Sequence, residues 1–209
     1  MSKKKIVNKI PIYRLKTTEE VMDYYDDWSK KNKYDKDMVG WNYTGPQETV
    51  NVLKKHIQNK DIKILDAGCG TGLVGVELKK YGYSNIDGVD LSESLLELVP
   101  KNFYKNLEQI DLNKPIQIKN NTYDVVMCVG TFTFGHVKAH ALDEFVRIVK
   151  NKGFVCFTIN EGIYEEYGFD KKIDELKKNK SWNIKEFFKS NYIASKDVNA
   201  WLCLAEVTK

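Results

Sequence analysis

A short apolar run that ends in an acid and turns through alternating glycines is the feature that most constrains this chain. The run is Ile64-Leu65-Asp66-Ala67-Gly68-Cys69-Gly70-Thr71-Gly72, and an amphipathic helical pattern over residues 73–81 follows at once. Glycines at these positions let the backbone approach a ligand where a Cβ atom would collide with it. The helix then directs its N-terminal N–H groups and the positive end of its dipole at that ligand.

Strand and helix patterns alternate along the chain on the C-terminal side of residue 60. We expect strands at 62–66, 85–90, 107–110, 123–129 and 154–159, with helices between them at 73–81, after Ser92 and at 139–149. A charged helix at 165–178 leads to two long strands, 182–194 and 199–207, whose short connection fits an antiparallel hairpin. Apolar strand centres separated by helices indicate a parallel sheet covered on both faces. The sequence therefore predicts a doubly wound α/β fold with a seven-stranded, mostly parallel sheet and a C-terminal antiparallel hairpin.

The 209 residues suit one domain with a substantial core. Residues 1–45 form a basic lead-in and an aromatic-rich stretch in which Thr17 or Thr18 caps a helix that has Glu20 early in its first turn. Residues 46–209, which begin with a helix from Pro46 to about residue 58, form the ligand-binding domain.

Charge and cysteine usage exclude several classes of protein. The net charge is only +4, lysines alternate with acids, and Arg14 and Arg147 are the only arginines, which argues against a nucleic-acid surface. The four cysteines form no C-x-x-C pair, so we expect buried, reduced thiols and no metal site. From the basic N-terminus and the absence of long apolar runs, we expect neither a signal peptide nor a membrane-spanning stretch. We expect a cytoplasmic monomer.

Three successive strands of the predicted sheet end on an acid, namely Asp66, Asp90 and Asp111. Ligands of doubly wound sheets bind at the carboxyl ends of the strands. A carboxylate at Asp90 can accept hydrogen bonds from two ribose hydroxyls, and one at Asp111 can receive the exocyclic amine of adenine. Each acid taken alone is as well explained as a helix cap or turn residue. All three together favour a nucleoside that also carries an ammonium and a carboxylate, such as S-adenosylmethionine (SAM).

These motifs resemble those of class I SAM-dependent methyltransferases, from about Tyr24 to the C-terminus. Residues 65–72 look like the first motif of that family, 88–92 and 109–112 like its second- and third-strand signatures, and 123–126 like its fourth strand. The terminal hairpin is similar to the reversed strand of its sheet. Residues 129–137 and 164–169, with Trp28 and Tyr34-Asp35, resemble the Williams–Beuren-region methyltransferase-like proteins in particular.

The resemblance implies SAM as cofactor and a role for each matching residue. Backbone at Gly68, Cys69, Gly70, Val129 and Gly130 would hold the methionine part of SAM, with Asp66 shaping the loop. Asp90 would bind ribose, Asp111 the adenine, and Leu91 with Leu112 would sandwich the adenine ring. Tyr34 and Tyr43 would fold over the cofactor as part of a lid, although plain helix packing explains such aromatic residues equally well.

Gly70, Gly72 and Gly75 also satisfy the G-x-G-x-x-G pattern of dinucleotide-binding enzymes. In those enzymes the glycines follow the strand directly, whereas here Asp66 and Gly68 come first. The chain also leaves little length for a separate substrate domain. A nicotinamide enzyme is therefore the weaker reading.

The loop after the fourth strand is where the methyl acceptor is expected. It offers Phe132, Phe134 and His136, which favours a small, partly apolar acceptor molecule. His136 is the candidate catalytic base, because imidazole titrates near neutral pH, although a locally bonded loop histidine is an equally simple reading. Two other functions stay open at this point. One is a protein or RNA methyltransferase that engages its substrate through Lys3–Lys5, and the other is a non-catalytic SAM-binding regulator.

Overall fold

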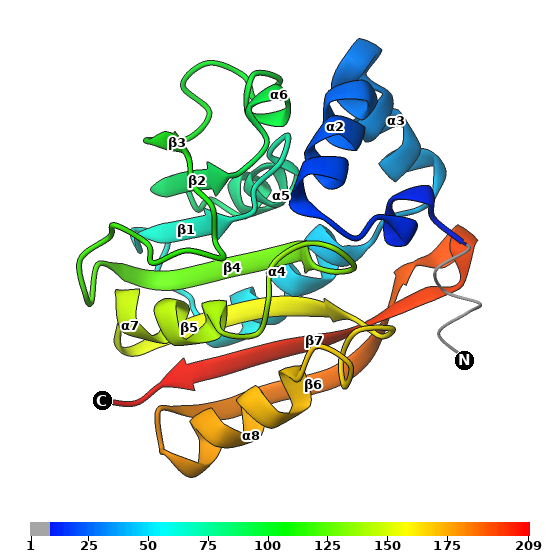
Figure 1. The fold of residues 1–209 in the computed structure, drawn as a ribbon. Coiled ribbons are helices and arrows are strands. Elements are labelled where there is room, and N and C mark those ends of the chain that lie inside the picture. Colours follow the sequence, from blue (N-terminus) through cyan, green and yellow to red (C-terminus); the bar gives the residue numbers. More distant parts are fainter. Residues whose placement is uncertain (1–8) are drawn as a thin grey trace.

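The structure, a computed structural model, describes residues 9–209, so the basic segment 3–5 lies outside the described residues. Its centre is a seven-stranded sheet in the order β3-β2-β1-β4-β5-β7-β6 (Figure 1). The strands are β1 (Ile64–Ala67), β2 (Ile86–Asp90), β3 (Leu107–Gln109), β4 (Tyr123–Phe132), β5 (Val149–Asn160), β6 (Trp182–Ile193) and β7 (Val198–Val207). Strands β1 to β5 pair in parallel, and β7 runs antiparallel to both β5 and β6. The predicted fold class is confirmed.

Helices cover both faces of this sheet. Helices α4 (Gly45–His56) and α5 (Leu73–Lys80) lie on one face, and α7 (Ala141–Ile148) and α8 (Phe169–Lys178) lie on the other (Figure 1). Val125 and Met127 of β4 join the core cluster under α4 and α5, whereas Val126 and Cys128 join the cluster under α7 and α8. Successive side chains of a strand point to opposite faces, so an almost unbroken apolar run such as β4 is buried on both sides.

Two predicted boundaries are wrong for reasons that lie in the backbone. Strand β5 begins at Val149 and not at residue 154, because Lys152 takes a positive φ of 64° and the pairing with β4 shifts register there. The chain bulges without leaving the sheet. Helix α8 begins at Phe169 and not at residue 165, since Gly168 precedes it in the left-handed conformation with φ 71°.

The N-terminal segment covers the edge of the sheet at which the parallel strands end (Figure 1). A short 3-10 helix η1 (Pro11–Arg14) leads to α2 (Thr18–Ser29), a 3-10 turn η2 (Lys30–Asn32) and α3 (Lys33–Gly40). Thr17 caps α2 as predicted, in a capping box with Glu20. Thr71 Oγ1 donates a hydrogen bond of 2.7 Å to Asp35 Oδ1, which fastens α3 to the glycine loop.

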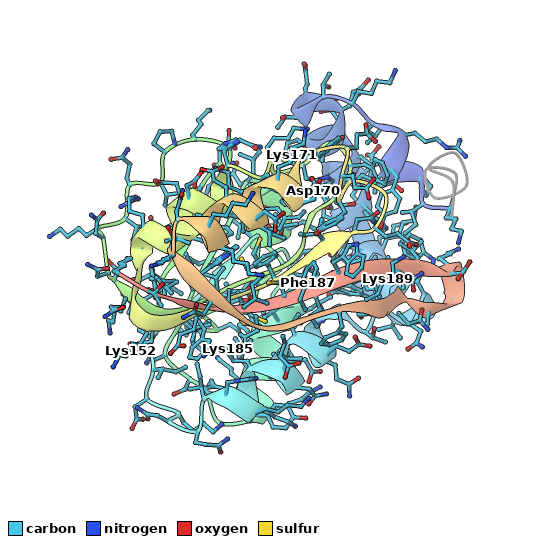
Figure 2. The ribbon with its side chains drawn as sticks, turned by 90° about the horizontal axis from the view of Figure 1, so that it is seen from below. Lys152, Asp170, Lys171, Lys185, Phe187 and Lys189 are labelled. Carbon is cyan, nitrogen blue, oxygen red and sulfur yellow. The ribbon has the colours of Figure 1, made fainter. Side chains whose placement is uncertain are left out.

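The remaining elements also lie at this edge of the sheet, beside the N-terminal segment. A 3-10 turn η3 (Ala194–Lys196) joins β6 to β7, and α6 (Glu93–Leu96) follows β2 with Ser92 as its N-cap. Strand β6 forms the outer edge, along which Lys185, Phe187 and Lys189 follow one another (Figure 2). Lys185 pairs with Glu206 and Lys189 with Glu161. Lysines on an edge strand disfavour pairing with a second sheet.

The expectations about the cysteines and about membrane-spanning segments can be compared with residues 9–209. All four cysteines there are free and buried, as expected for reduced thiols. No described helix has both the length and the apolar character that a membrane crossing requires.

Candidate functional site

A pocket opens where β1, β2, β3 and β4 end, beneath α2 and α3. We call it the strand-end pocket. It brings together most of the side chains and backbone predicted to form the site, namely Tyr34, Gly68, Gly70, Asp90, Leu91, Asp111, Leu112, Val129, Gly130 and His136. Asp66, Cys69 and Tyr43 are not part of its wall. Its mixture of apolar walls with a few polar groups is typical of small-molecule sites.

The glycine loop takes the conformation that its sequence predicts. Gly68 has a φ of 77°, and a Cβ atom built there would lie 2.0 Å from Oγ1 of Thr131. The N–H groups of Gly68 and Cys69 both donate to the carbonyl of Val89, at 2.7 and 3.0 Å. These two hydrogen bonds hold the loop against β2. At Gly68 and Gly70 the loop exposes backbone, without a side chain, to the pocket.

Asp90 organises the centre of the pocket. Its Oδ2 accepts a hydrogen bond from Gly70 N–H at 2.8 Å, and its Oδ1 accepts one from Ser92 N–H at 2.9 Å. Burial raises the pKa of this carboxyl, and the two N–H donors offset part of that rise. Asp111 stands at the next strand end, where its Oδ1 accepts from Asn113 N–H at 2.9 Å. Each carboxylate oxygen has a second lone pair, so both acids can still receive donors from a ligand.

Asp66 lies behind the loop and not in the pocket. It is fully buried, its Oδ2 accepts a hydrogen bond of 2.7 Å from the Tyr104 hydroxyl, and its Oδ1 has no partner among residues 9–209. Burial raises the pKa of Asp66 to about 7, although the Tyr104 hydroxyl lowers it in part. This placement suits the role of shaping the loop. The Cys69 side chain is also buried away from the pocket, so only its backbone faces the loop.

His136 is held by two hydrogen bonds in the wall of the strand-end pocket. Its Nδ1 lies 2.6 Å from the carbonyl oxygen of Phe134, and its Nε2 lies 2.9 Å from the hydroxyl of Tyr25. A carbonyl can only accept, so Nδ1 carries the proton and Nε2 accepts from Tyr25. Burial lowers the pKa of His136 to about 4, so the ring is neutral at pH 7.

A second cavity adjoins the strand-end pocket under the N-terminal segment. We call it the aromatic cavity, because most of its wall is aromatic. It is lined by Ile10, Ile12, Tyr13, Tyr25, Trp28, Tyr34, Met38, Trp41, Tyr43, Gly130, Thr133, Tyr192 and Ile193. Tyr25, Tyr34 and Gly130 belong to both walls and form the partition. Tyr43 packs edge-on against Tyr192, with 5.0 Å between ring centroids, so it faces this second cavity.

Several residues that build the site carry no signal in the sequence. Thr131 supports Gly68, Tyr104 holds Asp66, and Tyr192 reaches the site from β6. Tyr25 lies within the aromatic stretch, but nothing in that stretch indicates that its hydroxyl meets His136. These contacts join segments that are distant along the chain, and no local spacing encodes them.

No group of three or more histidine, cysteine or acidic side chains in residues 9–209 is arranged to hold a metal ion.

Comparison with known proteins agrees with this geometry. Residues 65–157 match the methyltransferase domain family. The human methyltransferase-like protein 27 is 33% identical over 141 residues, which cover 66% of this chain and 56% of that protein. An uncharacterized protein of Methanocaldococcus jannaschii is 33% identical over 177 residues, covering 81% of this chain and 73% of that protein. The chain thus spans little more than half of the length of the human relative.

Solved structures show the same fold at low sequence identity. An S-adenosylmethionine-dependent methyltransferase from Mesorhizobium loti matches with a TM-score of 0.56 and 15% identity over 75% of this chain and 96% of that one. A chain from the complex of the Haloferax volcanii Trm112 methyltransferase activator with a methyltransferase matches with a TM-score of 0.63 and 13% identity, over 88% and 98%. The family match shows that residues 65–157 form a methyltransferase domain, and the solved structures share its fold.

Proposed function

We propose that this enzyme binds SAM in the strand-end pocket and transfers its methyl group directly to a small, partly apolar molecule. The observation that carries the proposal is the Asp90 carboxylate, fixed by Gly70 N–H and Ser92 N–H at the centre of the pocket with Asp111 at the next strand end. SAM supplies a methyl group on a positively charged sulfur, which is already activated for displacement by a lone pair. The protein therefore has mainly to position the two reactants.

The residues of the pocket fit the parts of SAM. Asp90 would accept hydrogen bonds from the ribose hydroxyls, and Asp111 would accept one from the adenine amine, between the side chains of Leu91 and Leu112. The backbone of Gly68, Gly70 and Gly130 lines the pocket without side chains and would take the methionine part. Tyr34 would lie beside the sulfonium, where an aromatic ring stabilises a cation.

His136 is the group that would receive a proton when the acceptor carries one. It is neutral at pH 7, and its Nε2 is the free-base nitrogen, turned toward Tyr25. An acceptor whose nucleophilic atom bears no proton would need no base at all.

Calorimetric titration with SAM tests the cofactor assignment, and we expect micromolar binding that releases no proton. Incubation of the enzyme with radiolabelled SAM and a fractionated cell extract then tests the acceptor class. Label in the small-molecule fraction supports the proposal. Label in the protein or RNA fraction would overturn it in favour of a macromolecular acceptor, the class indicated by the name of the ribosomal protein L11 methyltransferase of Thermotoga neapolitana, which is 26% identical over 140 residues.

A further inference from the structure

The aromatic cavity has a composition that the cofactor does not explain. Its wall contains rings from η1, α2, α3 and β6, and it holds no aspartate, glutamate, lysine, arginine or histidine among the described residues. It meets the strand-end pocket only at Tyr25, Tyr34 and Gly130. A molecule in this cavity would therefore reach the cofactor across that partition.

The absence of charge from this wall restricts what the cavity can hold. A carboxylate or phosphate would be buried there without a cation, and an ammonium would be buried without a carboxylate. The acids close to this wall lie outside it: Asp37 accepts a hydrogen bond of 2.7 Å from Trp28 Nε1, and Asp90 lines the strand-end pocket. An uncharged molecule avoids both costs, and a flat one can pack against rings such as those of Tyr43 and Tyr192.

The cavity wall also contains one hydroxyl group whose hydrogen bonding is incomplete. Oγ1 of Thr133 is buried and makes no hydrogen bond of good geometry within residues 9–209, although the Tyr13 hydroxyl is near enough to interact with it. Thr133 is 5% exposed and belongs to the cavity wall. A buried hydroxyl of this kind is stabilised when a ligand supplies the missing partner.

Tyr25 is the only side chain that both lines the two cavities and contacts His136 within the described residues. Its hydroxyl donates to Nε2 of His136, so the lone pairs of the Tyr25 oxygen stay available to a donor on a ligand. The other titratable groups that face this pair are Tyr13, Tyr34, Tyr192, Asp90 and Lys138. Burial raises the pKa of the Tyr25 hydroxyl well above its usual range, so the tyrosinate anion is disfavoured. Tyr25 can therefore give up its proton only as it receives another.

Resting on the proposed function, we propose that the aromatic cavity binds the methyl acceptor, an uncharged aromatic compound with a hydroxyl group, and that this hydroxyl donates to Tyr25. The acceptor oxygen forms a bond to the methyl carbon while the carbon–sulfur bond breaks and its electron pair stays on sulfur. The acceptor proton passes to the Tyr25 oxygen as the Tyr25 proton passes to Nε2 of His136, and solvent later takes it from the imidazolium. One positive charge is present before and after the transfer, so the site gains no net buried charge.

The first experiment compares three ring compounds of similar size and different charge: para-cresol, benzoate and benzylamine. Binding is followed by ligand-observed NMR with S-adenosylhomocysteine present, and methyl transfer is followed by release of labelled product from SAM. We expect para-cresol to bind at millimolar concentration and to be methylated, with benzoate and benzylamine at least about tenfold weaker. A preference for either charged compound would overturn the proposal, and so would binding of none of the three by an enzyme that binds SAM.

A matched pair of variants tests whether the binding occurs in this cavity. Met38 lines the cavity, whereas its neighbour Val39 is 81% exposed on α3. Met38→Trp fills the cavity and should abolish para-cresol binding, while Val39→Trp should leave it unchanged. Thr133→Val keeps the shape of its side chain and should weaken para-cresol about fivefold through the lost hydrogen bond. Equal affinity in Met38→Trp and the wild type would place the binding elsewhere.

The pH dependence of methyl transfer to para-cresol shows whether Tyr25 and His136 relay a proton or only hold the structure of the site. Tyr25→Phe should lower kcat for para-cresol about 100-fold with little change in KM. In His136→Gln, activity should rise with pH toward the ionisation of para-cresol itself, near about pH 10, because the variant cannot take the proton. The wild type should show a flat profile between about pH 6 and about pH 9. A variant that is equally impaired at every pH would reduce His136 to a structural residue and overturn the relay.

These outcomes stay distinct from a failure of the proposed function. An enzyme that does not bind SAM contradicts the cofactor assignment whatever para-cresol does. An enzyme that binds SAM and methylates only charged acceptors keeps its proposed function and loses this inference.

Discussion

The strand-end pocket and the aromatic cavity share a wall but are built in opposite ways. The first takes its polar groups from successive strand ends of one sheet, whose register brings Asp90 and the residues after β3 to one edge. The second takes its rings from both ends of the chain, since Tyr13 of η1 and Tyr192 of β6 line the same space. The strand-end pocket contains acidic side chains and is shaped by backbone geometry. The aromatic cavity has an uncharged wall and is shaped by side-chain packing. Changes in one region should therefore leave binding in the other largely intact.

The largest expected effect is on SAM binding in Asp90→Ala. This variant removes two charge-assisted hydrogen bonds to ribose and the acceptor of Gly70 N–H, so SAM affinity should fall by about 4 kcal/mol, or about 1,000-fold. Calorimetry measures the loss, with the exposed Asp61→Ala as control. Binding of para-cresol should stay within about twofold of the wild type. Affinity for SAM within about threefold of the wild type would show that Asp90 does not bind the ribose.

The next effect compares two glycines with the same backbone conformation. Gly68 has φ 77° and Gly168 has φ 71°, but a Cβ atom collides with Thr131 only at Gly68, and none meets an atom within 4 Å at Gly168. Gly168→Ala should cost about 1 kcal/mol of unfolding free energy through backbone strain, and Gly68→Ala about 3 kcal/mol. Urea denaturation of both variants gives the difference. Equal losses of unfolding free energy in the two variants would mean that Thr131 moves aside. The glycine loop would then be too mobile to serve as a fixed backbone wall of the strand-end pocket.

The acidic region should also respond to pH, through Asp66. Burial raises the pKa of this carboxyl to about 7 in the folded state, against about 3.9 in an unfolded chain. The folded state therefore holds the proton more tightly, and the free energy of unfolding falls as the pH rises between these two values. From about pH 5 to about pH 7 the wild type should lose about 2 kcal/mol more than Asp66→Asn, which cannot titrate. Parallel pH profiles of the two proteins in urea denaturation would contradict this origin of the pH dependence.

The same contrast explains how much could be predicted from the sequence. The strand order, the glycine loop and the acids at the strand ends follow from short-range patterns, because a parallel sheet brings every carboxyl end to one edge. The aromatic stretch predicted that Tyr34 and Tyr43 lie near the site. It did not predict that Tyr34 lines both the strand-end pocket and the aromatic cavity, whereas Tyr43 lines the aromatic cavity alone. That division depends on how α2 and α3 pack against β6 and β4. Likewise, the bulge at Lys152 depends on the register of β5 with β4, which the turn residues 151–153 do not encode.

The smallest expected effect concerns the link between the two regions. Asp35 Oδ1 accepts from Thr71 Oγ1 at 2.7 Å, and this bond joins the helix that carries Tyr34 and Met38 to the glycine loop. Asp35→Ala should cost about 1 kcal/mol of SAM affinity, about fivefold, mainly as faster dissociation because α3 covers the pocket. Asp26→Ala, an exposed acid on α2, controls for the change of charge. Stopped-flow measurement of both variants gives the rates. If Asp35→Ala changed only para-cresol binding, α3 would stabilise ligands in the aromatic cavity alone. SAM binding in the strand-end pocket would then not depend on the position of α3.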